Sequence, residues 1–245
     1  MKAIELVGAR GASWLPNIID YRPSDAGDPS ILIMEYKSGE SLDKSNTWLT
    51  SRRLIARKLA EITKGIHDIH GRRHGPLEGD SYDSWLNLMD EKFWRHVNRA
   101  SACRLLNSSD LDAIDRVYTV NRAIFSSIPA QLVHFDLKPA NIIFDSTSKH
   151  VSLVDFELTR FGDSDFDFVK MDLLSQRWPE YRKSIAETVL AEIYGGTDLR
   201  SILGLKYIIY CIYYYAAILT FEAEQGRPSP PYRIRAWATL LASLR

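Results

Sequence analysis

The stretch His134-Phe-Asp-Leu-Lys-Pro-Ala-Asn141, followed by Val154-Asp-Phe-Glu157, decides how this chain is interpreted. Two apolar runs, 141–144 and 150–154, lie between the centres of these motifs, and Asp145-Ser-Thr-Ser-Lys149 separates them. Short apolar runs joined by turn-forming residues predict a pair of strands. A lone His-x-Asp or Asp-Phe-Glu means little, but the joint pattern is hard to reach by chance. The two motifs are therefore predicted to meet at one strand pair.

The residue types in these motifs suit phosphoryl transfer from ATP. An attacking hydroxyl needs a carboxylate that orients it and takes its proton, and Asp136 is predicted to be this base. A triphosphate is held through divalent metal, which prefers oxygen ligands, and Asn141 and Asp155 are predicted to hold Mg²⁺. Lys138 is expected to reach the transferred phosphate as a point charge, and His134 is expected to anchor the loop by hydrogen bonding.

These motifs resemble those of the aminoglycoside phosphotransferase and choline kinase group, small-molecule relatives of the protein kinases. That group has a His-x-Asp-x-x-x-x-Asn loop and an Asp-Phe or Asp-Trp metal motif, often followed by Gly-Asp-x-x-x-Asp, here Gly162-Asp-Ser-Asp-Phe-Asp167. The resemblance implies that Asp167 braces the catalytic loop. It also implies an ATP-dependent kinase that acts on a hydroxyl of a small molecule, either aminoglycoside-like or an amino alcohol.

The resemblance extends to the segment from Ile31 to Leu42, which is similar to the hinge strand of the group. It implies that the backbone around Glu35, Tyr36 and Lys37 binds the adenine of ATP. The run Asn17-Ile-Ile-Asp-Tyr21 is rich in β-branched and aromatic residues and predicts the strand that pairs with this segment in a hairpin.

Protein kinases are the near alternative, because His-x-Asp-Leu-Lys-Pro-x-Asn is also the wording of their catalytic loop. Their metal motif is Asp-Phe-Gly, whereas this chain has Asp-Phe-Glu, and no Ala-Pro-Glu segment follows it. A large helical segment, residues 82–128, precedes the catalytic loop. Such a segment suits the small-molecule kinases, in which it helps to form the substrate site.

The resemblance also implies an N-terminal lobe with a phosphate-covering loop and a strand lysine that pairs with a helix glutamate. Lys2 is too close to the start to lie on a preceding strand, and Gly8-Ala-Arg-Gly11 is more typical of a solvated turn. Glu5 is either that glutamate or a surface residue. A truncated or misassigned start, a natural short form and an inactive relative are three competing explanations. The alternative function is thus a catalytically weak or inactive kinase-fold protein that binds nucleotide or a partner chain.

The composition limits the classes of partner that this chain is expected to bind. Lys plus Arg number 31 and Asp plus Glu number 31, and a neutral chain gives no reason to expect nucleic acid or an anionic membrane as a partner. Tyr207–Phe221 is apolar but shorter than the ~20 residues of a membrane span, so it predicts a buried core helix. No signal peptide is recognised, and a cytoplasmic location is expected. Nothing in the composition indicates an oligomeric state.

The predicted fold class is α+β and protein-kinase-like. Residues 1–40 are expected to form a partial N-terminal lobe with the β-hairpin and hinge, and residues 41–245 a mainly helical C-terminal lobe that carries the catalytic loop and metal motif. Apolar residues at helical spacing predict helices over 50–70, 82–99 and 109–126.

Overall fold

The computed structural model describes residues 2–9, 11–22, 31–44 and 46–245. Helices form the bulk of this part of the chain and the strands are short, which confirms the predicted α+β class. The chain divides into two compact units: unit 1 comprises Met1–Ser81 and Ala130–Asp198, and unit 2 comprises Tyr82–Pro129 and Leu199–Arg245. The expected division at residue 40 separates roles in the reaction rather than compact units, and it stays a prediction.

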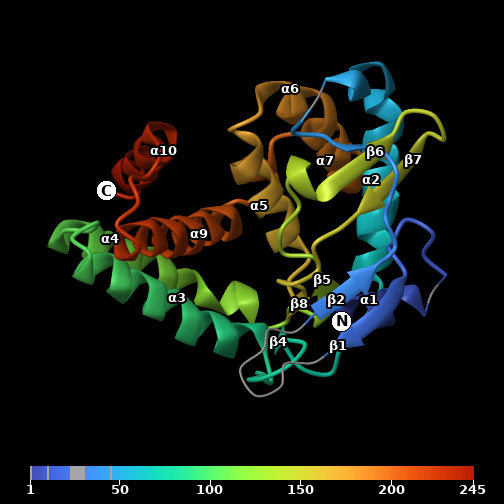
Figure 1. Cartoon of the computed structure of the whole chain (residues 1–245). Helices are drawn as coiled ribbons and strands as arrows, with labels where there is room; N and C mark the ends of the chain where they lie inside the picture. The colour runs from blue at the N-terminus through green and yellow to red at the C-terminus, as the bar shows by residue number, and fades with distance from the viewer. Residues whose placement is uncertain (1, 10, 23–30, 45) are drawn as a thin grey trace. The chain divides into compact units, whose positions relative to one another are not determined.

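Unit 1 combines small antiparallel sheets with helices (Figure 1). Its strands are β1 (Ile18–Arg22), β2 (Ile31–Met34), β3 (Glu40–Ser41), β4 (Gly75–Pro76), β5 (Gln131–Val133), β6 (Ile142–Asp145), β7 (His150–Leu153) and β8 (Arg160–Gly162). Its α-helices are α1 (Lys2–Gly8), α2 (Arg52–His67), α5 (Asp165–Ser175), α6 (Pro179–Tyr181) and α7 (Glu187–Tyr194). Short 3-10 segments cover Thr47–Ser51 and Pro139–Asn141, and a π-helical turn covers Arg182–Ala186.

The predicted N-terminal hairpin is confirmed. Strands β1 and β2 pair antiparallel with Ile18 opposite Met34 and Arg22 opposite Ile31. The expected turn between them falls on residues 23–30, which lie outside the described residues. Helix α1 was not predicted, although Ala3, Ile4 and Val7 give it a buried face at helical spacing.

Strands β6 and β7 form the strand pair predicted between the two motifs, with Ile142 opposite Leu153 and Asp145 opposite His150. Strand β3 pairs on the other side of β6, so the sheet order is β3-β6-β7. Gly39 precedes this contact with φ +115°, and a Cβ there would lie 2.4 Å from the carbonyl oxygen of Phe144. Only glycine lets the two backbones approach this closely.

Helix α2 positions the start of the catalytic segment. Its buried face includes Ile55, Leu59 and Ile66, which have the helical spacing expected from the sequence. Beyond its last turn, the carbonyl of Ile69 accepts a 2.7 Å bond from the amide of Leu132 in β5. Strand β5 pairs in turn with β8, so the end of α2 and β8 hold the strand that leads into His134.

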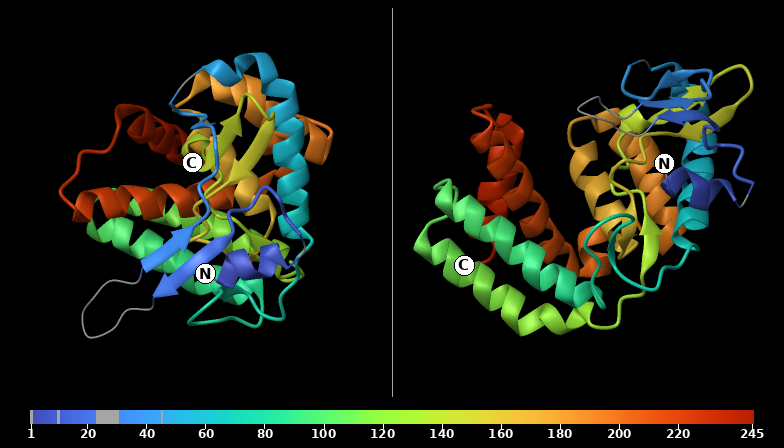
Figure 2. Two further views of the ribbon diagram at one scale, coloured as in Figure 1. Left: turned by 45° about the vertical axis from the view of Figure 1, so that its right-hand side comes forward. Right: turned by 60° about the horizontal axis from the view of Figure 1, so that its bottom comes forward.

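Unit 2 is helical and consists of α3 (Trp85–Ala102), α4 (Ser108–Asn121), a 3-10 turn at Arg122–Phe125, α8 (Leu199–Leu203), α9 (Leu205–Glu224) and α10 (Pro231–Ala242), all drawn in two further views in Figure 2. Helix α3 begins after Ser84, whose hydroxyl accepts a bond from the Asn87 amide. Asn107 and Asp110 form a capping box at the start of α4.

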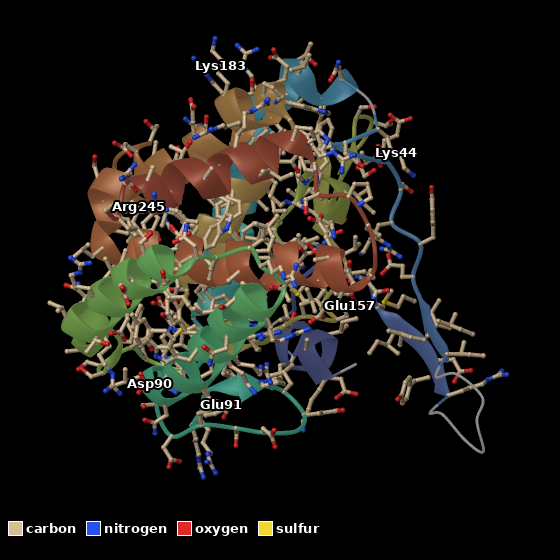
Figure 3. All side chains as sticks on the ribbon, turned by 90° about the vertical axis from the view of Figure 1, so that its left-hand side faces the viewer. Lys44, Asp90, Glu91, Glu157, Lys183 and Arg245 are labelled. Atoms are coloured by element: carbon tan, nitrogen blue, oxygen red, sulfur yellow. The ribbon has the colours of Figure 1, made fainter. Side chains whose placement is uncertain are left out.

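Several aromatic side chains contact one another in the interior of unit 2. The indole of Trp85 donates a 2.7 Å bond to the hydroxyl of Tyr210, and both residues are buried. The ring of Phe93 stacks on Tyr118 at 4.1 Å between centroids. The Tyr118 hydroxyl donates a 3.0 Å bond to Asp90, labelled on α3 in Figure 3. Polar groups on these rings are thus satisfied inside the unit.

The predicted core helix over Tyr207–Phe221 is confirmed as part of α9, whose buried residues lie between Ile209 and Thr220. Within the described residues, no single helix is long and apolar enough to cross a membrane. One bent pair, Pro179–Leu203 with Leu205–Glu224, passes that test by length and composition only.

Candidate active site

The loop between β5 and β6 brings three of the predicted site residues into direct contact. Lys138 Nζ lies 2.5 Å from Asp136 Oδ2. The amide nitrogen of Asn141 donates to the same Oδ2 at 3.1 Å and to the Asp136 carbonyl at 3.0 Å. Asp136 and Asn141 are buried, whereas the Lys138 side chain is 31% exposed. The carboxylate is therefore fixed on one side by an amide and accompanied by a cation that reaches solvent.

The fully buried carboxylate of Asp167 binds the backbone of this loop. Its Oδ1 accepts a 2.6 Å bond from the Phe135 amide, and its Oδ2 accepts a 2.9 Å bond from the His134 amide. The Nε2 of His67 adds a third bond to Oδ2 at 3.0 Å. Burial favours the neutral acid, but His67 first, and then His134 and the Phe135 amide, outweigh it and keep the pKa of Asp167 below its usual value.

The imidazole of His134 links the two motifs. Its Nδ1 accepts a 3.2 Å bond from the Asp136 amide, so Nε2 carries the proton and donates to the Val154 carbonyl at 3.1 Å. Burial lowers the pKa of His134 and outweighs the attraction of Asp167. The ring is therefore neutral and bonds to each motif, with no group free to act as an acid.

Two site residues adopt the left-handed backbone region that side chains disfavour. Phe135 has φ +67° and Asp155 has φ +67°. Such conformations persist only where the surroundings fix them, and they gather at functional sites. At Phe135 the fixing bond is the one to Asp167, because it ties the strained amide directly to a buried anion.

The two predicted metal ligands lie at the same end of the β6–β7 pair. The register that places Ile142 opposite Leu153 continues with a 3.0 Å bond from the Val154 amide to the Asn141 carbonyl. Asp155 follows directly. The side-chain nitrogen of Asn141 donates to Asp136, so its side-chain oxygen is the atom that could serve as a ligand. An amide oxygen and a carboxylate are suitable ligands for Mg²⁺, which takes few protein ligands and completes its shell with phosphates and water.

In the part of the chain that the structure describes, no group of three or more His, Cys, Asp or Glu side chains could hold a metal by itself. The two oxygen donors at Asn141 and Asp155 fit a Mg²⁺ ion whose remaining ligands are phosphate oxygens and water.

A pocket of about 250 Å³ adjoins Asp155. Its apolar wall comes from α1, from the turn before β1 and from β2, and its polar side comes from the metal motif. It is lined by Ile4, Pro16, Leu32, Met34, Asp155, Phe156 and Glu157, the last of which is labelled in Figure 3. An apolar slot that ends in a carboxylate could hold a flat aromatic base and the phosphates attached to it.

The predicted adenine-binding residues, 35–37, come directly after β2, which lines this pocket. The carboxylate of Glu35 accepts bonds from the amide and the side chain of Asn17 at 3.1 and 2.8 Å, and Lys37 pairs with the same carboxylate. The side chain of Tyr36 is exposed. These side chains are engaged elsewhere or point to solvent, and the prediction for this segment concerns its backbone groups.

Two residues at this site escaped the sequence analysis. His67 belongs to α2, far from the motifs in sequence, and histidines near a helix end give no signal for a buried partner. Lys170 lies in α5, where its Nζ is 3.5 Å from Asp136 Oδ1 and donates to the Phe135 carbonyl. Its position three residues after Asp167, on the next helical turn, is the signal that could have found it.

Charges around Asp136 favour its ionised form. Burial raises its pKa, but Lys170 first and Lys138 second pull in the opposite direction, with a further contribution from the Asn141 amide. The net effect holds the pKa of Asp136 below its usual value. A carboxylate in this state can accept a hydrogen bond from a hydroxyl and orient it.

The profile of the phosphotransferase enzyme family matches residues 4–201, which is most of the 245-residue chain and includes both motifs. The chain belongs to this family. The resemblance inferred from the two motifs is therefore confirmed. Among curated proteins, none matches this chain.

Comparison with solved structures identifies the fold of this family member. It is similar to a thermostable mutant of aminoglycoside phosphotransferase APH(4)-Ia, solved with ADP and hygromycin B, with a TM-score of 0.71 and 14% identity over 99% of this chain and 81% of that one. Choline kinase LicA from Streptococcus pneumoniae gives 0.61 and 19% over 99% and 79%. Plasmodium vivax ethanolamine kinase gives 0.59 and 17% over 99% and 70%. These similarities confirm the predicted protein-kinase-like fold.

Proposed function

We propose that this chain is an ATP- and magnesium-dependent phosphotransferase that phosphorylates a hydroxyl group of a small molecule. The observation that carries the proposal is the contact between Asp136, Lys138 and Asn141 on a loop whose backbone is bonded to buried Asp167. A carboxylate held this way suits the role of base, because its direction is fixed before substrate arrives.

In this proposal each part of the site has one role. Asp136 accepts the proton of the attacking hydroxyl, and Lys138 turns from Asp136 towards the transferred phosphate. Asn141 and Asp155 hold Mg²⁺, which neutralises charge on the phosphates when it is bound. Residues 1–40 supply the nucleotide side of the site through the backbone at 35–37, and residues 41–245 supply the catalytic side.

The proposed cofactor and substrate classes draw support from the similar structures. Nucleotides are bound in several of them: ADP and AMP-PNP in the aminoglycoside phosphotransferase and AMP in LicA. Their named substrates, hygromycin B, choline and ethanolamine, combine a hydroxyl with an amino or ammonium group. We therefore propose an amino-bearing alcohol or aminoglycoside as the substrate class.

The decisive experiment measures ADP release and phosphorylated product with ATP, Mg²⁺ and a panel of aminoglycosides and amino alcohols. The parent chain is compared with Asp136→Asn, which keeps the size of the side chain and removes its basicity. We expect turnover of at least one panel member to fall by roughly 10²–10⁴-fold in the variant. The matched control is Asp145→Asn, which changes an exposed turn carboxylate and is expected to retain parental turnover.

Equal turnover in the parent and in Asp136→Asn would contradict the enzymatic proposal. A parent that binds ATP with Mg²⁺ but transfers no phosphate to any panel member would instead favour the non-catalytic alternative. Nucleotide binding is therefore measured on the same samples by calorimetry, with and without Mg²⁺. Binding is expected to weaken in Asp155→Asn, since a proposed metal ligand loses its charge.

A further inference from the structure

A second lysine, Lys170, contacts the catalytic loop, and its side chain is largely buried. Its Nζ lies 3.5 Å from Asp136 Oδ1, whereas Lys138 and Asn141 both contact Oδ2. The same Nζ donates to the carbonyl oxygen of Phe135. One ammonium group therefore bonds to the residue with the strained backbone and also to the carboxylate that follows it.

The surroundings of Phe135 show why this turn needs a fixed partner. Its φ of +67° is unfavourable for a residue with a large side chain. Its ring is stacked on Phe166 at 4.6 Å with an interplanar angle of 7°, and the guanidinium of Arg160 lies 3.8 Å from the ring centroid. Lys170 Nζ lies 4.8 Å from the same centroid. The ring and the amide of Phe135 are thus held by neighbours, and Lys170 holds the carbonyl.

The two lysines at Asp136 differ in freedom. The Lys138 side chain is 31% exposed and sits two residues from Asp136 on the same loop. The Lys170 side chain is 12% exposed and projects from helix α5, which also carries Asp167. A lysine on a packed helix with two bonded partners keeps its position at a smaller cost in entropy than one on an open loop. Lys170 is the fixed cation of this pair.

We propose that Lys170 is a positioning residue that keeps Asp136 in its productive orientation by holding Oδ1 and the left-handed turn at Phe135. This inference rests on the proposed function of Asp136. In this proposal, different residues fix the two carboxylate oxygens of Asp136: Lys170 contacts Oδ1 and Asn141 contacts Oδ2. Lys138 can then move to the phosphate. The loop then retains its shape at the moment when Lys138 leaves the carboxylate.

The test compares three variants with the parent. Lys170→Met removes the ammonium group and keeps the length of the side chain, and Lys170→Arg keeps a cation at the same place. Lys92→Met is the matched control, because Lys92 is a similarly shielded lysine that pairs with Glu91 on helix α3 of unit 2. For each chain we would measure kcat, the KM for ATP and the melting temperature.

We expect Lys170→Met to lower kcat by about 10-fold or more, because a small misplacement of a catalytic group has large effects on rate. The KM for ATP should change less than threefold, since the pocket beside Leu32 and Asp155 is untouched. Lys170→Arg should recover part of the lost kcat, and Lys92→Met should keep parental values. An unchanged kcat in Lys170→Met, or a loss that Arg does not reduce, would overturn the proposal. So would parallel losses in ATP affinity and melting temperature.

A readout without turnover separates this inference from the proposed function. Hydrogen exchange of the amides of residues 134–136 is measured in nucleotide-free protein. Lys170→Met should accelerate exchange there and Lys92→Met should not; equal rates in Lys170→Met and the parent would overturn the inference. If Asp136→Asn leaves turnover unchanged, the proposed function fails, and exchange alone decides the role of Lys170. Lys170→Gln, judged by the same criteria, replaces the Met variant should that variant not fold.

Discussion

The two units of this chain hold their interiors together in different ways. The interior of unit 1 around the catalytic loop contains charges that satisfy one another, with Asp167 accepting three bonds and Asp136 contacting two lysines. The interior of unit 2 contains rings, such as Trp85, Tyr210 and the stacked pair of Phe93 and Tyr118. A charge network fixes atoms in particular directions, whereas ring packing mainly excludes water.

This difference explains what each unit reveals about function. Directional contacts among Asp, Asn, Lys and His in unit 1 are the basis of the proposed reaction. The packed rings of unit 2 stabilise its interior, and their packing does not indicate which ligand the protein binds. The substrate class is accordingly proposed from the reaction and from similar structures rather than from unit 2.

The most severe test of the comparison is Asp167→Ala in unit 1. The change leaves two buried amides and His67 without their acceptor, and we expect the free energy of unfolding to fall by about 3 kcal/mol. Urea denaturation followed by circular dichroism measures it. Asp172→Ala on the same helix removes an ion pair with Arg182, whose side chain is 44% exposed. This change should lower the free energy of unfolding by less than half as much. Equal losses would mean that the network around Asp167 has no special weight.

A smaller effect is expected from Tyr210→Phe in unit 2. The ring and its packing remain, but the indole of Trp85 loses its acceptor in a buried place. We expect a loss of about 1–2 kcal/mol in the free energy of unfolding, typical of one unpaired buried donor. Fluorescence of the tryptophans during urea titration provides the measurement. A loss as large as that of Asp167→Ala would show that unit 2 also depends on directional bonds.

Acid should distinguish the units through His96 in unit 2. Burial first, and then the charges of Arg95, Arg99 and Lys92, lower its pKa to about 4. Its folded pKa lies below the unfolded value of about 6.5, so its contribution to stability is fully present above pH 6.5 and is lost as pH falls towards 4. Over this pH range, the free energy of unfolding of His96→Gln should fall by on the order of 1 kcal/mol less than that of the parent. Identical pH profiles would contradict this assignment.

The smallest effect is expected from Tyr36→Ala beside the pocket. The side chain is 82% exposed, and the prediction for this segment uses only its backbone. The affinity for ATP should stay within about twofold of the parent, which corresponds to less than 0.5 kcal/mol. Calorimetric titration with ATP and Mg²⁺ measures it. A tenfold loss would show that the tyrosine ring itself contacts nucleotide.

The sequence allowed the fold to be predicted where local patterns and motif chemistry agree. The hairpin of β1 and β2, the pair of β6 and β7, and the core helix α9 all follow from short apolar runs, turn residues and hydropathy. The contacts of His67 and Lys170 could not be predicted in the same way, because their partners are distant in sequence. Their helices show only apolar spacing, which says which face is buried and not which polar group that face meets.

Helix α1 shows a different limit. Its seven residues include Gly8 and carry too few apolar positions for a periodic pattern to stand out, yet Ala3, Ile4 and Val7 are buried. Tertiary contacts stabilise such a short helix, since isolated helices of this length are not stable in water. Glu5, which the sequence left as either the glutamate of the lysine pair or a surface residue, is exposed on this helix.

The bond between His67 and Asp167 joins positions separated by 100 residues, and unit 1 is built from two stretches of chain with part of unit 2 between them. During synthesis, the chain emerges from its N-terminus, so Asp136 leaves the ribosome before the carboxylate that braces its loop. Contacts of such wide sequence separation form late, because the chain must first close a long loop. The newly made chain therefore contains the whole motif from His134 to Asn141 before Asp167 of α5 is present to hold the backbone of that loop.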